Sequence, residues 1–201
     1  MFSEYSRIRP KNYMDIEKLP KSKLPMPWGE FNVIGFTDHD GEEHLAIYLG
    51  DISENPLLRI HSQCLTGDAL FSLRCDCGPQ LAMALEKIAS DGNGIVIYMA
   101  QEGRGIGLIN KIRAYELQDQ GMNTAEANEK LGFAADEREY AFCAEILNSL
   151  GISSVRLMTN NPSKIKGLED AGIKVSERIA IQAKPTDENK EYLKIKSKYI
   201  G

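Results

Sequence analysis

The order in which apolar runs follow one another restricts the fold of this chain more than any other feature. Two runs rich in β-forming residues, 31–36 and 44–49, come first, and the turn sequence Asp38-His39-Asp40-Gly41 joins them. Later apolar runs alternate with segments in which apolar residues recur with a helical period. Antiparallel signals followed by strand–helix alternation predict an α/β fold, in which helices cover a mixed sheet.

The same patterns predict the individual elements. Strands are expected at 31–36, 44–49, 57–60, 94–100, 155–158 and 175–181, and helices at 79–92, 108–120, 138–150 and from 162 onward. Cys143 falls on the apolar stripe of its expected helix, so we interpret it as a core thiol. Asp136 precedes that helix, where a negative charge interacts favourably with the helix dipole, and capping is its simplest interpretation.

Length and charge limit the classes of function. With 201 residues, the chain is long enough for a single domain with a full core. We expect this domain at residues 24–201, after a polar N-terminal extension at 1–23. Acidic residues outnumber basic ones by 29 to 24, which disfavours a nucleic-acid partner but allows a pocket for a small anion. No apolar run approaches the roughly 20 residues that span a membrane, so we expect a cytoplasmic protein with reduced thiols.

Three of the four cysteines, Cys64, Cys75 and Cys77, fall close together in the sequence. In a reducing compartment such a cluster is typical of a metal site, and three thiolates suit tetrahedral zinc. Three protein ligands with water in the fourth position would form a catalytic site, whereas His61 as a fourth ligand would form a closed structural site. The spacing leaves both interpretations open, together with a cluster that binds no metal.

A nucleobase deaminase is a further class that carries zinc beside cysteines. Those enzymes need a glutamate two residues after the histidine and a later P-C-x-x-C sequence. This chain has Gln63 at the first position, and its cysteine pair is C-x-C with the proline after it. The sequence therefore excludes this class on both counts.

Three other segments contain groups that bind anions. Residues 101–108 (QEGRGIGL) carry Arg104 beside backbone N–H groups at the start of an expected helix. Residues 159–164 repeat this arrangement, with Lys164 in the first turn of the following helix. Arg138 stands at the start of its expected helix, where the dipole does not favour a cation. A tight turn and ordinary capping explain the first two segments equally well, so none of the three identifies a ligand alone.

Together, six ordered motifs resemble the GTP cyclohydrolase II family. They are RIHSQCLTGD at 59–68, RCDCG at 74–78, QEGRGIGL at 101–108, NKIRAY at 110–115, LGFAADER at 131–138 and TNNP at 159–162. The similarity extends from about residue 24 to residue 181. Some members of this family carry an additional N-terminal synthase domain, and we expect none within the short extension at residues 1–23.

The resemblance implies a zinc-dependent enzyme that hydrolyses GTP. The reaction opens the imidazole ring of guanine and releases formate and pyrophosphate. Its product is 2,5-diamino-6-(5-phosphoribosylamino)pyrimidin-4-one, and it is the first committed step of riboflavin biosynthesis. The resemblance also implies a homodimer, and a magnesium ion held by the triphosphate.

The resemblance further implies a role for individual residues. The zinc ligands are Cys64, Cys75 and Cys77. The residues around GTP are Arg59, Ile60, His61, Ser62, Gln63, Gln80, Glu102, Gly103, Arg104, Thr124, Thr159 and Lys164. Asp136 is the proton acceptor, Arg138 is the nucleophile at the α-phosphate, and Tyr115 acts at the base.

Two positions depart from the family pattern. Gln63 replaces a glutamate, and Ala100 replaces an arginine that usually precedes QEGR. The first change exchanges an ionisable group for an amide, and the second removes a cation near the expected phosphate loop. These departures motivate an alternative, a paralogue that binds GTP but has lost part or all of the reaction. A structural zinc module that binds a macromolecule is disfavoured by the acidic net charge.

Overall fold

The computed structural model describes residues 19–134 and 136–190 of the chain. Most of the expected N-terminal extension, residues 1–18, lies outside the described residues. Within the described part, seven strands form one sheet in the order β1-β2-β3-β5-β4-β6-β7. The strands are β1 Lys21–Met26, β2 Gly29–Thr37, β3 Glu43–Leu49, β4 Leu57–Ser62, β5 Gly94–Met99, β6 Ser154–Met158 and β7 Lys174–Ile179.

The sheet is mixed, with its antiparallel pairs on one side and its parallel pairs on the other. Strands β1, β2, β3 and β5 pair antiparallel, whereas β4 pairs parallel with β5 and β6, and β6 pairs parallel with β7. The hairpin of β2 and β3 turns at the Asp38–Gly41 segment, where the Asp38 carboxylate accepts hydrogen bonds from the backbone N–H groups of Asp40 and Glu42. The predicted α/β fold with a mixed sheet is confirmed.

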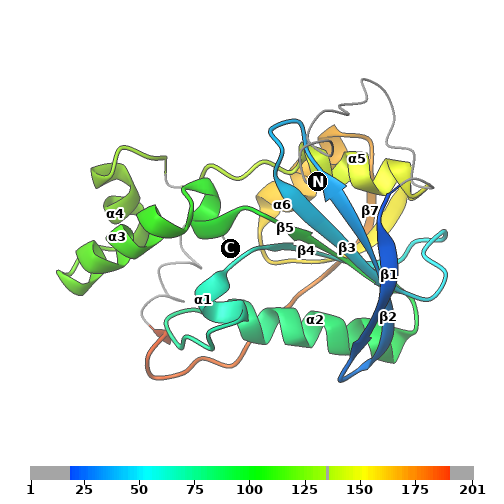
Figure 1. Cartoon of the computed structure of the whole chain (residues 1–201), viewed down its shortest axis with the longest axis horizontal. Helices are drawn as coiled ribbons and strands as arrows, with labels where there is room; N and C mark the ends of the chain where they lie inside the picture. The colour runs from blue at the N-terminus through cyan, green and yellow to red at the C-terminus, as the bar shows by residue number, and fades with distance from the viewer. Residues whose placement is uncertain (1–18, 135, 191–201) are drawn as a thin grey trace, which may run out of the picture.

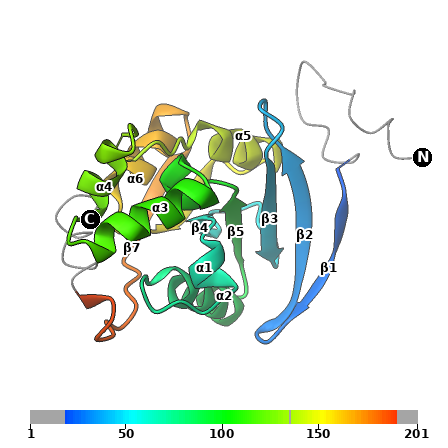
Figure 2. The ribbon, with the colours of Figure 1, turned by 60° about the vertical axis from the view of Figure 1, so that its left-hand side comes forward.

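Helices cover both faces of this sheet (Figures 1 and 2). They are α1 Leu65–Asp68, α2 Cys77–Asp91, α3 Leu108–Asp119, α4 Thr124–Lys130, α5 Ala141–Ser149 and α6 Pro162–Asp170, with the 3-10 turn η3 Glu102–Gly105. Helix α2 lies on one face, and α5 and α6 lie on the other, while α3 and α4 stand to one side of the sheet (Figure 1). None of the described helices has the length and apolar character that crossing a membrane requires.

Strand alternation divides the core into two layers. Ile95 and Ile97 of β5 belong to the same buried cluster as Ile146 of α5. Val96, between them in sequence, belongs instead to the cluster that contains Ile88 of α2. Because successive side chains of a strand point to opposite faces, this one buried strand contributes to both layers.

Three elements differ from the sequence-based expectations. Strand β1 begins at Lys21, before the boundary expected at residue 24. It is an edge strand whose first three residues are exposed, while Leu24 and Met26 pack against the core. Helix α4 was not predicted; a capping box formed by Asn123 and Glu126 stabilises this short helix. Helix α5 begins at Ala141 rather than at residue 138, so the preceding acidic and basic residues lie in a loop.

Candidate active site

The carboxyl ends of the parallel strands open into a cavity of about 600 Å³. Its wall includes Gln63 and Cys64 after β4, Gln101 after β5, Thr159 after β6 and Ala180 after β7. Loops at this edge of an α/β sheet are the usual place for a ligand, because helices and loops from several strands converge there. The cavity is therefore the candidate site of this fold.

Positive charge dominates the wall of the cavity although the chain as a whole is acidic. The basic lining residues are Arg59, Arg74, Arg104, Lys111, Arg138, Lys164 and Arg178, and the acidic ones are Asp76, Glu102 and Glu188. A concave surface with an excess of one charge concentrates ligands of the opposite charge. The cavity thus suits a polyanion.

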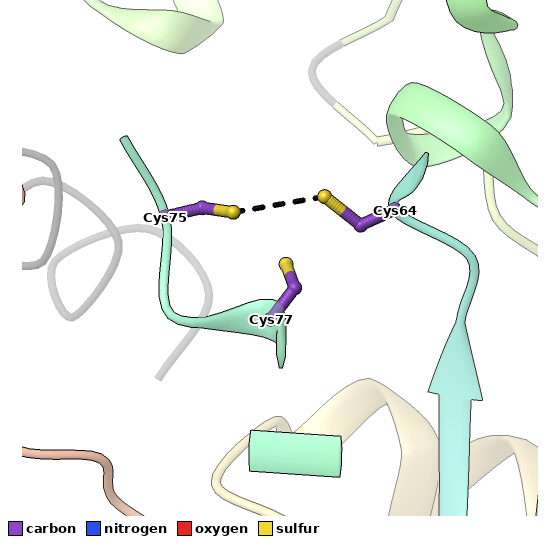
Figure 3. A group of neighbouring side chains, drawn as sticks. All are labelled: Cys64, Cys75 and Cys77. Atoms are coloured by element: carbon purple, nitrogen blue, oxygen red, sulfur yellow. Dashed lines mark hydrogen bonds between the residues drawn. The ribbon is translucent and has the colours of Figure 1, made fainter. Parts of the chain in front are cut away.

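The three clustered cysteines converge on one point of this wall. Their sulfur atoms all lie within 4.8 Å of one another, and the Sγ atoms of Cys64 and Cys75 are 3.6 Å apart. Figure 3 shows the sulfur atoms of Cys64, Cys75 and Cys77 pointing toward one another. Zinc–sulfur bonds of about 2.3 Å in a tetrahedron place two sulfurs about 3.8 Å apart. The cluster therefore has the ligand type and the spacing that zinc requires.

Electrostatics within the cluster also favour a bound cation. Hydrogen bonds from the thiols of Cys75 and Cys77, and from the ammonium of Lys111, hold the pKa of Cys64 far below its usual value. The ionised Cys64 accepts a hydrogen bond from Cys75 and thereby raises the pKa of that thiol to about 11. Without a metal, the three thiols consequently do not all ionise near neutral pH, whereas a divalent cation stabilises all three thiolates.

Gly67 of α1 leaves open the space that the cluster uses. A Cβ at this position would lie 2.7 Å from the Sγ of Cys75 and 3.2 Å from the Sγ of Cys64. Both distances are shorter than ordinary van der Waals contact, so a larger residue would displace the sulfurs. Glycine is therefore required at this position, because the sulfurs of Cys64 and Cys75 pass close to its backbone.

Gly67→Ala is accordingly expected to weaken zinc binding by about tenfold or more, a scale typical of disturbing the surroundings of metal ligands. Competition with a chromophoric chelator measures the affinity. Gly35→Ala in β2 is the matched control, because its Cβ would meet only Pro20 Cγ at 3.3 Å. Equal zinc affinity in Gly67→Ala and wild type would show that the metal does not bind among these sulfurs.

His61 does not belong to the sulfur cluster. Its Nε2 lies 3.0 Å from Oδ1 of Asp68, and the same carboxylate accepts hydrogen bonds from the backbone of Cys64 and the hydroxyl of Tyr98. Burial lowers the pKa of His61, which favours the neutral ring. The group of potential metal ligands found among the described residues contains the three cysteines alone. The geometry thus favours three protein ligands over a closed site with His61.

Arg59 connects strand β4 to the loop that carries two of the cysteines. Its Nη1 donates to the carbonyl of Met158 at 3.0 Å, and its Nη2 donates to Oε1 of Gln80 at 2.6 Å. Gln80 in turn donates to Asp76, between Cys75 and Cys77, at 2.5 Å. Burial lowers the pKa of Arg59 to about 10, so this side chain is still a cation at neutral pH. Its buried Nε has no hydrogen-bond partner within the described chain.

The Gly-rich segment after β5 forms the turn η3. Gly103 and Arg104 both adopt the left-handed conformation, with φ of 63° and 64°. Glycine adopts this region without cost, whereas an arginine there is unusual and is held by its surroundings. The carbonyl of Arg104 accepts a hydrogen bond from the backbone N–H of Glu137 at 3.1 Å. This contact joins the turn to the loop that precedes α5.

Asp136 and Arg138 form a side-on ion pair in that loop. The guanidinium donates from Nε to Oδ1 at 2.8 Å and from Nη2 to Oδ2 at 2.5 Å. Although burial alone would raise it, the pKa of Asp136 is lowered by the hydrogen bonds from Arg138. Because α5 begins only at Ala141, the interpretation of Asp136 as a helix cap was wrong. Its carboxylate instead orients a guanidinium that lines the cavity.

The segment after β6 combines capping with a place in the cavity wall. The side chain of Asn161 accepts a hydrogen bond from the backbone N–H of Ser163 at 2.8 Å, which caps α6 as expected. Lys164 is buried and donates from Nζ to the carbonyl of Ile60 at 2.8 Å. Both Thr159 and Lys164 line the cavity. The capping interpretation therefore does not exclude contact with a ligand.

All but two of the residues expected around GTP or in the reaction line this single cavity. The exceptions are Ile60 and Asp136. The side chain of Ile60 lies in the core, so it can contribute only backbone atoms to a ligand site. Ala100, one of the two departures from the family pattern, is also absent from the described cavity wall. Its backbone N–H donates to Nδ1 of His44 at 2.9 Å.

The cavity wall also contains polar residues that the sequence-based prediction did not include. They are Arg74, Asp76, Gln101, Lys111, Gln118, Asn128, Asn160, Asn161, Arg178, Gln182 and Glu188. Arg74 stacks on the ring of Tyr115, with its guanidinium carbon 4.4 Å from the ring centre. A signal for Lys111 was present, because it precedes Tyr115 by one helical turn and so shares its helix face.

The fold and the site together define an α/β protein in which three cysteines that could hold a metal ion lie beside a cationic cavity. The family model for GTP cyclohydrolase II matches residues 17–180. A GTP cyclohydrolase-2 from Shewanella amazonensis is 57% identical over 191 residues, which cover 94% of this chain and 93% of that protein. One from Buchnera aphidicola subsp. Schizaphis graminum is 54% identical over 191 residues, covering 94% of this chain and 97% of that protein.

A riboflavin biosynthesis protein from Vibrio vulnificus is 55% identical over 192 residues, or 94% of this chain. The chain spans only 52% of the length of that relative. Given the family match over most of the chain, this chain belongs to the GTP cyclohydrolase II family.

Proposed function

We propose that this chain hydrolyses GTP to formate, pyrophosphate and 2,5-diamino-6-(5-phosphoribosylamino)pyrimidin-4-one, the first committed step of riboflavin biosynthesis. The observation that carries the proposal is the position of the three thiols, which open into the same cationic cavity as Arg138. A single bound nucleotide could therefore contact a metal on the three cysteines with its guanine ring and the guanidinium of Arg138 with its phosphates.

Cys64, Cys75 and Cys77 would hold zinc, which when bound supplies the Lewis acid that activates water for attack on C8 of guanine. Arg59 supports an anionic or polar ligand nearby, because its buried Nε lacks an acceptor within the described chain. Tyr115, whose ring contacts Arg74 and lies near Lys111, would position the base beside the cluster. The nucleotide would thus lie with its base toward the sulfurs.

The triphosphate would lie toward the turn η3 and the loop before α5. Arg104 and Arg138 line the cavity there, and the hydrogen bond from Glu137 to the carbonyl of Arg104 holds the two segments together. In the proposed reaction, Arg138 attacks the α-phosphate and displaces pyrophosphate, and Asp136 accepts its proton. Water then cleaves the phosphorus–nitrogen bond, which releases the 5′-monophosphate and restores the arginine. The ion pair supports an orienting role for Asp136, since the carboxylate contacts two nitrogens of the guanidinium.

Magnesium, the homodimer and the cytoplasmic location complete the proposal. Cations outnumber carboxylates in the cavity, so magnesium would enter on the triphosphate rather than on protein ligands. The sulfurs of Cys64 and Cys75 are close enough to form a disulfide under oxidising conditions, so a metal site on these cysteines would need a reducing compartment such as the cytoplasm. The homodimer rests on family membership.

Incubation of the purified protein with GTP and magnesium, with formate and pyrophosphate assayed separately, tests the proposed function. Both products are expected in equal amounts. Binding of GTP without either product would favour the paralogue that has lost the reaction. Pyrophosphate without formate would favour a partial reaction that stops before deformylation, with the ring either closed or opened to a formamide.

Gln63→Glu is expected to raise kcat. Gln63 lines the cavity next to Cys64, and an amide cannot accept or release a proton as the family glutamate can. General acid–base catalysis typically contributes about 10²–10⁴-fold, which bounds the gain. Steady-state kinetics of the two single variants, Gln63→Glu and Ala100→Arg, show how much each departure from the family pattern affects the reaction. Ala100 lies outside the cavity wall, whereas Gln63 lines it. An unchanged kcat in Gln63→Glu would mean that this residue serves only to hold the substrate.

A further inference from the structure

Lys111 brings a buried positive charge directly to the metal-binding cysteines. From α3, its Nζ lies 3.1 Å from the Sγ of Cys64 and 2.8 Å from Oε1 of Glu102. The residue is only 8% exposed, so both contacts are largely shielded from water. A charge-assisted hydrogen bond in such a place holds its acceptor more firmly than one at the surface.

Glu102 extends this contact back to the segment that follows Cys64. Its Oε1 also accepts a hydrogen bond from the backbone N–H of Gly103 at 2.9 Å, and its Oε2 accepts one from the backbone N–H of Leu65 at 2.6 Å. Cys64, Lys111, Glu102 and Leu65 therefore form a closed ring of contacts. The ring joins the end of β4, the turn η3 and the helix α3.

Close packing holds the aliphatic part of the Lys111 side chain in place, in addition to the hydrogen bonds of its ammonium group. A Cβ on Gly103 would lie 3.0 Å from the Cβ of Lys111, so the turn η3 and the lysine stem are in direct contact. Lys111 also lies 5.7 Å from the centre of the Tyr115 ring. The side chain thus has little freedom to leave the sulfur of Cys64.

The charge of the cluster explains why an ammonium is suitable there. Three thiolates around one divalent zinc carry a net negative charge, which is costly to bury without a cation nearby. The Nζ of Lys111 contacts both the Sγ of Cys64 and Oε1 of Glu102, so the lysine supplies a donor group at the edge of the cluster.

We propose that Lys111 is a positioning residue, which orients the Cys64 sulfur for the metal and ties the metal cluster to the turn η3 through Glu102. This inference depends on the zinc site of the proposed function. It assigns a role to a residue that binds neither the metal nor, in the proposed mechanism, the reacting atoms. Loss of the lysine should therefore weaken metal binding itself, in the absence of any substrate.

Zinc affinity without nucleotide, measured by competition with a chromophoric chelator, tests this role. Lys111→Met retains much of the stem and removes the charge and the donors. Its affinity is expected to fall by about 10–100-fold, the typical effect of removing a partner of a metal ligand. Lys87→Met, at an exposed position of α2, is the matched control and should bind zinc like the wild type.

A second variant distinguishes the effect of losing the Lys111–Cys64 contact from a general loss of fold stability. Lys111→Met leaves Glu102 buried without its cation, whereas Lys111→Met combined with Glu102→Gln removes both charges. The double variant should recover thermal stability of the metal-free protein but retain the weakened zinc affinity. Wild-type affinity in Lys111→Met, or full recovery in the double variant, would overturn the proposal. Absence of zinc binding by the wild type would instead contradict the proposed function.

Discussion

Replacing Cys75 by serine is expected to abolish zinc binding and formate release together. A serine hydroxyl does not ionise near neutral pH and is a poor zinc ligand, so the cluster would retain two thiolates. The loss of zinc affinity should exceed the about 10–100-fold effect of removing an outer partner of a ligand. Metal analysis after dialysis, followed by a formate assay with GTP, gives both results on one sample.

Cys143→Ala is the matched control for Cys75→Ser. Cys143 is also a buried thiol, but it lies on the core-facing side of α5 and outside the sulfur cluster. This variant should lose some stability, because a buried sulfur is removed, and it should retain one zinc per chain. Full zinc content in Cys75→Ser would contradict the assignment of the three cysteines as the metal site.

Arg138→Ala is expected to reduce pyrophosphate release by more than the about 10²–10³-fold that the loss of one electrostatic contact costs. The reason is that the proposed reaction uses the guanidinium itself to displace pyrophosphate. Arg138→Lys retains a positive charge but loses the side-on geometry with Asp136. It should therefore be nearly as impaired as Arg138→Ala.

Rapid-quench measurement of pyrophosphate, with zinc-free wild type in parallel, distinguishes this step from ring opening. The zinc-free protein is expected to release pyrophosphate slowly without forming formate. Pyrophosphate release by Arg138→Ala at the wild-type rate would identify water, rather than the arginine, as the group that attacks the phosphate. Substantial activity in Arg138→Lys would indicate that the charge alone is sufficient.

The fold was predictable where a local pattern determines it. The hairpin of β2 and β3 has β-forming runs on either side of a turn sequence, and the start of α6 has an Asn-Pro pair, so both were expected from sequence. Strand β1 and helix α4 were not predicted. The first is an edge strand with a charged beginning, and the second depends on a capping box rather than on an apolar period.

The sequence motifs that form the site were predictable, but the side-chain contacts between these motifs were not. Cys64, Cys75 and Cys77 lie close together in sequence, so local spacing indicated a metal site. By contrast, the contact of Lys111 with Cys64 joins residues on separate elements, and no local pattern encodes it. Asp136 was misinterpreted as a cap because the start of α5 was placed too early, at residue 138; the helix begins at Ala141, and Asp136 pairs with Arg138 in the loop before it.

Formate production during the return of zinc to metal-free protein tests the central claim most directly. The claim is that one zinc, bound by the three cysteines, enables ring opening of GTP. With GTP and magnesium in excess, the initial rate of formate release should rise linearly and reach a plateau at one zinc per chain. A full rate of formate release by the metal-free protein, with or without a further effect of zinc, would contradict it.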